Sequence, residues 1–187
     1  MVNARRAEYS RAGPGISDPM TDSAVPPAST IRPAGAGDAE GIASVFLASA
    51  EYHAALDPER YATPAIAGIS ARYRAGRQHP SECTEVVTLV AEVDGEVVGF
   101  IDARLEQSHD PMHREMTYCH VAEIAVSGGH RSLGIGGRLL RAVEEWGRRK
   151  GAAFASLEYH VANKPAGVFY EQRMGYSPAA TILIKRL

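Results

Sequence analysis

The sequence predicts an α/β fold: a mixed central β-sheet with helices on both faces, in the order β-αα-βββ-α-β-α-β. The main support is the stretch from Tyr118 to Gly151, which has the pattern of a buried strand, a glycine-rich turn and a helix. The dipeptide Asp94-Gly95 adds a second signal, because it separates two strand-like segments and so predicts a tight hairpin. These features predict one folded domain over residues 30–187.

Each expected element has a local signal. Asp38 is placed to cap the first helix, Thr63-Pro64 to start the second, and Pro165 stands in the first turn of the last. In chain order, the expected elements are a strand at 31–33, helices at 38–51 and 63–76, strands at 85–93, 96–105 and 118–126, a helix at 136–150, a strand at 153–161, a helix at 165–174 and a last strand at 180–184.

Net charge, apolar content and cysteine count limit the kinds of protein that this chain can be. The chain has 187 residues, a formal net charge of −2 and two cysteines. This charge predicts no general attraction to nucleic acid or to acidic membranes, and no apolar run approaches the roughly 18 residues of a membrane-spanning helix. Two cysteines suit reduced thiols in a cytoplasmic protein. Residues 1–29 are rich in Ala, Gly, Pro and Ser and predict a disordered leader, and nothing in the composition conflicts with a homodimer.

The glycine-rich turn is the strongest candidate for a binding site. Arg131, Gly134 and Gly136 form R-x-x-G-x-G at the start of a helix, where unpaired backbone N–H groups and the helix dipole attract anions such as a pyrophosphate. A glycine-rich connection that binds nothing is the plain alternative. A Walker loop is excluded because Arg138 follows the last glycine, and a dinucleotide fingerprint is excluded because Leu139 stands in place of its third glycine.

Over residues 30–187 the chain resembles the GNAT superfamily of acetyl-CoA-dependent N-acetyltransferases. The stretch AVSGGHRSLGIGGRLL resembles the family's acetyl-CoA motif, and Asn163, Ala166 and Tyr170 followed by Gly175-Tyr176 resemble its N-x-x-A-x-x-x-Y…G-F/Y segment. One extra residue separates Tyr170 from Gly175, which usually stand four apart in this family.

The resemblance implies acetyl-CoA as cosubstrate and no metal. In this family the central strand and the next one splay apart, so main chain of the central strand can pair with the pantetheine arm as an added strand would. Asn163 would bond the pantetheine or the strand opposite, and it is also placed to cap the following helix. The implied cofactor-binding residues are Ile124, Ala125 and Val126 on the strand, Arg131, Ser132, Leu133, Gly134, Ile135, Gly136 and Gly137 in the turn, and Asn163, Ala166 and Tyr170 downstream.

Acetyl transfer also needs acid–base groups. The family uses a tyrosine at the place of Tyr170 to protonate the departing CoA thiolate, and the plain alternative for Tyr170 is a packing aromatic. For the base that keeps the amine neutral, we favour His120 over Glu123, with ordered water alone as a third alternative. His120 and Glu123 would lie on opposite faces of a regular strand, but a bulge would bring them closer.

The implied function is an N-acetyltransferase that moves an acetyl group from acetyl-CoA to a primary amine by direct attack. The acceptor can be a small molecule or a protein amine. One rival is a non-catalytic acetyl-CoA-binding module of the same fold, and another is a nucleotide-phosphate binder. Tyr52, His53 and Tyr61 stand where this family lines the acceptor pocket, although each is equally well explained by packing. Cys119 is expected to be structural, and His109 and His113 are expected to be loop residues.

Overall fold

The computed structural model describes residues 29–75, 85–108, 111–112 and 114–186. Within these residues five strands form one sheet in the order β1-β2-β3-β4-β5, with antiparallel pairs except for the parallel pair of β4 and β5. The predicted mixed sheet is therefore confirmed. The elements are β1 (Thr30–Pro33), α1 (Ala39–Leu56), α2 (Ile66–Arg74), β2 (Val86–Val93), β3 (Glu96–Gln107), β4 (Thr117–Val126), α3 (Ile135–Arg149), β5 (Phe154–Leu157) and α4 (Lys164–Gly167), which continues as a π-helix over Val168–Arg173.

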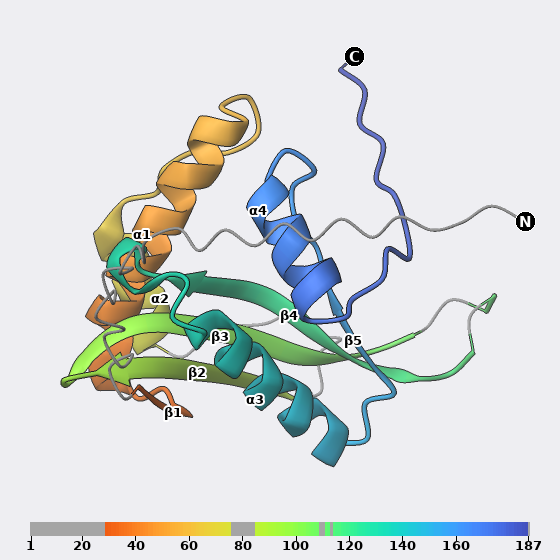
Figure 1. Ribbon diagram of the computed structural model, residues 1–187, viewed down its shortest axis with the longest axis horizontal. Coiled ribbons are helices and arrows are strands. Elements are labelled where there is room, and N and C mark those ends of the chain that lie inside the picture. Colours follow the sequence, from red (N-terminus) through yellow and green to blue (C-terminus); the bar gives the residue numbers. More distant parts are fainter. Residues whose placement is uncertain (1–28, 76–84, 109–110, 113, 187) are drawn as a thin grey trace, which may run out of the picture.

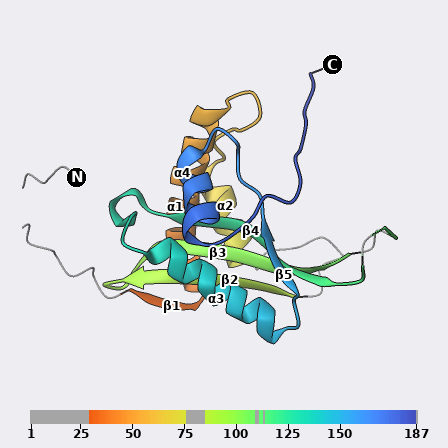
Figure 2. The same cartoon turned by 45° about the vertical axis from the view of Figure 1, so that its right-hand side comes forward.

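Helices cover both faces of the sheet, as the sequence predicts (Figures 1 and 2). On one face, α3 buries Leu139, Leu140 and Val143 against the sheet. On the other face, α1 and α2 bury Ile42 and Tyr73 in a second cluster. Burial of apolar surface stabilises both interfaces, and the two clusters fix the sheet from opposite sides.

Most predicted elements are confirmed within a few residues. The hairpin of β2 and β3 turns at Asp94 and Gly95, whose φ angles of 50° and 83° are those of a type I′ turn. The prediction that the Asp38 side chain caps the first helix is wrong. The Asp38 carboxylate makes no hydrogen bond to the start of α1; it accepts hydrogen bonds from the Gly35 N–H (2.7 Å) and from Arg32 instead.

The end of the chain departs most from the prediction. β5 stops at Leu157 instead of 161, because beyond this residue the chain no longer runs beside β4. The expected last strand at 180–184 is wrong: this segment carries no secondary structure and runs away from the sheet (Figure 1). Strand propensity is not enough without a neighbouring strand to complete the hydrogen bonds.

The extra residue between Tyr170 and Gly175 is absorbed by the π-helix. A π-helical turn holds more residues than an α-helical one, so one insertion fits without breaking the helix. Gly175 follows with a φ of 79°, in the left-handed region that favours glycine.

Candidate active site

The sheet opens between β4 and β5. The two strands pair over Tyr118–Val121 and Phe154–Leu157, and beyond Val121 no described strand runs beside β4 on that side. The Ser127 N–H donates to Val98 O on β3 (2.8 Å), and alternation along an antiparallel strand therefore directs the main-chain groups of Ile124 and Val126 toward the open side. This edge can accept a strand-like ligand.

The glycine-rich turn continues from this open edge into α3. Gly134 has a φ of 78° and Ser132 a φ of 64°, and Ser132, Leu133 and Gly134 are exposed. Across the described part of the chain, no protein group accepts a hydrogen bond from the backbone N–H groups of residues 132–137, and Arg138 is the first residue of α3 to bond a carbonyl of the helix turn. These unused donors at the start of a 15-residue helix fit the oxygens of a diphosphate.

Side chains from three elements meet beside the turn. The Arg131 Nε donates to Val126 O (3.2 Å), and its guanidinium lies 6.0 Å from the centre of the Tyr52 ring on α1. The Tyr52 hydroxyl donates to Asn163 Oδ1 (3.4 Å), which also accepts from the Ala166 N–H at the start of α4. Asn163 is thus a helix cap, and it joins α4 to α1 as well.

Tyr170 lies in the π-helix and is 9% exposed. Its ring is surrounded by Phe169, Tyr159 and Tyr176, with ring centres 5.0, 5.8 and 6.2 Å away. Burial, and to a smaller degree the Glu123 carboxylate, raises the pKa of Tyr170 to about 12. The phenol therefore keeps its proton at neutral pH, and the charge on Glu123 is close enough to influence it.

β4 contains a bulge, and a bulge is the condition under which the sequence predicts His120 and Glu123 to lie closer together. Glu123 pairs with Asp102 and Val121 with Ala103, which leaves Ala122 without an opposite residue. The extra residue reverses the alternation, so His120 and Glu123 face the same side of the sheet. They differ in position: His120 lies opposite Ser156, where β4 and β5 are still paired, and Glu123 lies beyond the last paired residue.

His120 is held by the paired end of the strands. Its Nδ1 lies 3.1 Å from Ser156 Oγ. Burial lowers the pKa of His120 below its ordinary 6.5, with smaller effects from Glu106, Arg104 and Glu158. The imidazole is therefore neutral at pH 7, which a base requires.

A group of aromatic and histidine rings lies where α1 ends and the connection to α2 begins. The His53 and Tyr61 ring centres are 5.5 Å apart, Tyr61 is 5.9 Å from His160, and His160 Nε2 is 3.4 Å from Asp57 Oδ2. The sequence singled out His53 and Tyr61 but missed His160, whose only signal is a histidine near the end of a predicted strand. Asp102, a buried carboxylate opposite Glu123 that accepts from Tyr73 (2.9 Å) and Thr88 (2.5 Å), was also missed.

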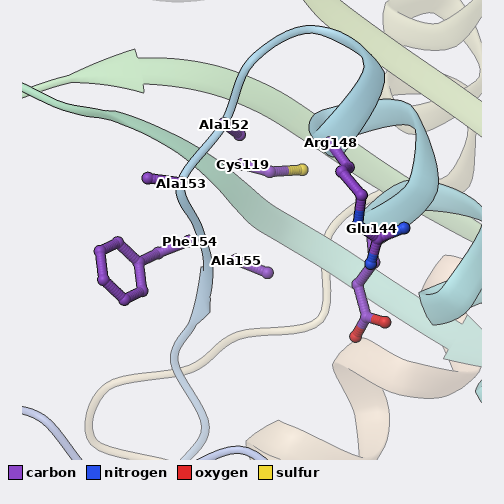
Figure 3. Close-up of a pocket in the computed structure, with 7 residues that line it drawn as sticks. All are labelled: Cys119, Glu144, Arg148, Ala152, Ala153, Phe154 and Ala155. Carbon is purple, nitrogen blue, oxygen red and sulfur yellow. The ribbon is translucent and has the colours of Figure 1, made fainter.

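Figure 3 shows a pocket at the other end of α3, lined by Cys119, Glu144, Arg148 and residues 152–155. The helix residues that line it, Glu144 and Arg148, lie about two and about three helical turns beyond Gly137. Burial raises the pKa of Cys119 to about 11, which makes its thiol unreactive and agrees with a structural role. His109 and His113 lie outside the described residues.

Two further features concern the described part of the chain. It holds no cluster of three or more His, Cys, Asp or Glu side chains arranged to bind a metal ion. None of its helices combines the length and apolar character needed to cross a membrane.

Residues 50–176 match the model of the acetyltransferase (GNAT) family, and the chain belongs to this family. It is 39% identical over 92 residues to an N-alpha-acetyltransferase of Sulfurisphaera tokodaii, covering 47% of this chain and 55% of that one. It is 35% identical over 102 residues to the acetyl transferase GW6a of Oryza sativa, covering 50% of this chain and 24% of that one. The chain thus spans about half the length of the first relative and a quarter of the second.

Solved structures share the fold. A mutant of the BH1408 protein of Bacillus halodurans superposes with a TM-score of 0.74 at 19% identity, covering 84% of this chain and 99% of that one. AAC(6')-Iy in complex with a bisubstrate analogue of CoA and acetylneamine gives a TM-score of 0.61 at 18% identity, covering 86% and 98%. Another structure of AAC(6')-Iy contains CoA.

Proposed function

We propose that this protein transfers an acetyl group from acetyl-CoA to a primary amine, by direct attack of the amine in a ternary complex. The observation that carries the proposal is the continuity of two sets of donors: the open edge of β4 leads directly into the unused backbone N–H groups at the start of α3. A long cosubstrate with an amide-containing arm and a diphosphate needs both in this order. The names of an N-alpha-acetyltransferase and an aminoglycoside N-acetyltransferase among the similar proteins agree with an amine acceptor.

Each segment has a separate part in binding. Residues 132–137 hold the diphosphate with their N–H groups, and the positive end of the α3 dipole adds to the attraction. Ile124, Ala125 and Val126 extend the sheet edge along the pantetheine arm. Asn163 and Ala166 fix the start of α4 on the opposite side of the opening, and so place Tyr170 beside it.

The chemistry follows from groups around the opening. The amine nitrogen attacks the thioester carbon and forms the C–N bond, while a base takes the proton that the amine loses. A main-chain N–H on the open edge of β4 stabilises the oxyanion. The C–S bond then breaks, and Tyr170 Oη gives its proton to the leaving sulfur, to be reprotonated from solvent. The same dry surroundings that raise the pKa of Tyr170 also raise the basicity of the thiolate, which helps this transfer.

The geometry favours Glu123, acting through a water molecule, as the base. Glu123 lies where β4 and β5 have separated and its charge influences Tyr170, whereas His120 lies at the paired end beside Ser156. The sequence alone favoured His120. The acceptor approaches from the face that carries α1 and α2, where Tyr52, Tyr61 and His160 provide aromatic surface for the stem of a small-molecule or protein amine.

The proposal is tested by the variant Tyr170→Phe. Acetyl-CoA and a panel of amines are mixed with the protein, and free thiol is measured. Because a general acid contributes about 10²-fold or more to the rate, we expect kcat to fall by at least that factor. The rise in melting temperature on adding CoA should stay the same, because the hydroxyl is not needed for binding.

Tyr159→Phe is the matched control. The ring centres of Tyr159 and Tyr170 are 5.8 Å apart, and the Tyr159 hydroxyl donates a hydrogen bond to Glu171 at the surface. Removal of the Tyr159 hydroxyl should therefore change kcat only a few-fold. An unchanged kcat in Tyr170→Phe would remove the assigned role. Stabilisation by CoA without thiol release for any amine would instead indicate a non-catalytic CoA-binding module.

A further inference from the structure

Tyr176 contacts Tyr170 through its main chain and through its ring. The Tyr176 N–H donates a hydrogen bond to the Tyr170 carbonyl (3.0 Å), and the two ring centres lie 6.2 Å apart at an interplanar angle of 66°. An edge-to-face arrangement of this kind is a favourable aromatic contact. A change in the position of Tyr176 therefore moves both the backbone and the ring of Tyr170.

The hydroxyl group of Tyr176 connects this pair to α3. It donates a hydrogen bond to Glu144 Oε1 (3.0 Å), and both side chains are half-buried. Burial, followed by the Glu144 carboxylate, raises the pKa of Tyr176 well above its ordinary value of 10. The hydroxyl therefore keeps its proton at neutral pH and remains a donor. A hydrogen bond to a charged acceptor is also stronger than one between neutral groups.

The π-helix that carries Tyr170 depends on contacts outside itself. The Met174 N–H donates to Phe169 O (3.1 Å), five residues back, and the Tyr176 N–H donates to a carbonyl six residues back. Helices of this kind are rare and short, and they are often found at functional sites. Because local preference does not favour this geometry, neighbouring elements have to hold it in place.

Contacts of this kind come from one face of α3. A Cβ built at Gly136 would lie 3.5 Å from Phe169 Cζ. A Cβ built at Gly137 would lie 3.5 Å from Met174 Sδ. Glu144 lies on the same face, because it follows Gly137 by about two helical turns. The hydrogen bond to Glu144 therefore fixes the π-helix relative to the helix whose first residues are proposed to hold the diphosphate.

We propose that Tyr176 and Glu144 are positioning residues for Tyr170. Their hydrogen bond holds the π-helix against α3, at the place where Tyr170 Oη reaches the sulfur of the departing thiolate. The inference rests on the proposed acetyl transfer and on the role of Tyr170 as its acid. Neither residue needs to touch the substrates for this effect, because a small displacement of a proton donor lowers the rate without weakening binding.

The test is a double-mutant cycle of Tyr176→Phe and Tyr170→Phe, in which thiol release from acetyl-CoA is measured. Tyr176→Phe keeps the ring but removes the hydrogen bond to Glu144. We expect kcat to fall about 10-fold, with the KM for acetyl-CoA unchanged. In the Tyr170→Phe background, the same change should have no further effect on kcat, because the hydroxyl that it positions is already absent.

Substitutions on α3 provide a conservative variant and a matched control. Glu144→Ala should lower kcat as Tyr176→Phe does, whereas Glu144→Gln keeps an oxygen acceptor and should restore most of this loss. Glu145→Ala changes the next residue, whose carboxylate pairs with the exposed Arg148, and should leave kcat unchanged. Hydrogen exchange of the π-helix, residues 168–173, should become at least about five-fold faster in Tyr176→Phe and Glu144→Ala only.

All assays are made below the melting temperature of each variant, so that loss of folded protein does not contribute. A wild-type kcat in Tyr176→Phe would overturn the proposal and leave the proposed acetyl transfer intact. An equal fall in both backgrounds would also overturn it, since Tyr176 would then act without Tyr170. Unchanged hydrogen exchange in Tyr176→Phe would show that the hydrogen bond does not hold the π-helix. If the wild type releases no thiol, or if Tyr170→Phe keeps the wild-type kcat, the acid role fails and the positioning role is rejected with it.

Discussion

Ala122 decides which side chains of β4 face the same way. As the unpaired residue of the bulge, it places His120 and Glu123 on one face, although their spacing of three predicts opposite faces in a regular strand. The two side chains differ in where they lie relative to β5. Glu123 lies at the opening, where its charge influences the pKa of Tyr170, and His120 is bonded to Ser156 where the strands are still paired.

Because Glu123 lies at the opening and His120 does not, substitutions of the two residues should change kcat by different amounts. We expect Glu123→Gln to lower kcat by about 10²-fold, because the amide keeps the size of the side chain but cannot accept a proton. His120→Gln should change kcat only a few-fold. The measurement is kcat and kcat/KM against pH for both variants.

The pH profile provides the check. The pKa of His120 is lowered by burial, so if His120 were the base, activity would fall as pH decreases through a value below 6.5, and His120→Gln would abolish this acid limb. Such a result, with Glu123→Gln near wild-type activity, would reject Glu123 as the base.

At the scale of elements, α3 connects the binding turn to the sheet, and its distance from β4 is set by a glycine. A Cβ built at Gly147 would lie 2.6 Å from Cys119 Cβ and 2.9 Å from its sulfur. The helix can approach the strand this closely only without a side chain at position 147. By contrast, Gly68 in α2 has no atom within 4 Å of an added Cβ.

Gly147→Ala should therefore lower the free energy of unfolding by about 1–3 kcal/mol through overpacking. Gly68→Ala is the matched change in an open helical position, and it should raise the free energy of unfolding by up to about 1 kcal/mol because alanine favours the helix. Urea denaturation measures both. A neutral Gly147→Ala would mean that α3 lies farther from β4 than this structure places it.

At the scale of the whole molecule, we propose that the opening between β4 and β5, the turn and the cap of α4 bind CoA together. A ligand that engages all three in the folded state stabilises that state by mass action. The length of this proposed site distinguishes CoA from a ligand that offers phosphates alone, since such a ligand contacts the turn but leaves the edge of β4 open.

CoA should accordingly raise the melting temperature more than ATP or NAD does. At a concentration 100 times its Kd, the stabilisation is about 2.7 kcal/mol, which corresponds to roughly 5–10 °C for a chain of this size. A thermal-shift assay with the three ligands at equal concentration makes the comparison. Stronger stabilisation by ATP or NAD would favour a nucleotide-phosphate binder instead.

The sequence by itself determined the parts of this protein that depend on near neighbours. Asp94-Gly95 sets its own turn, R-x-x-G-x-G sets the left-handed residue before α3, and the apolar spacing of α3 sets the face that it buries. In each case the backbone preference of a few consecutive residues is sufficient. The same is true of Asn163, whose side chain caps α4 by accepting a hydrogen bond from the backbone N–H of Ala166, three residues later.

Only the tertiary structure decided the features that need a distant partner. The Asp38 carboxylate can accept hydrogen bonds either from the start of α1 or from Arg32. The hydrogen bond from Arg32 forms only when β1 and α1 are both in place. The pairing of β4 with β5 decides which of His120 and Glu123 reaches the opening. The segment 180–184 has the propensity of a strand, but a strand exists only where another strand supplies the hydrogen bonds, and its own sheet does not supply them.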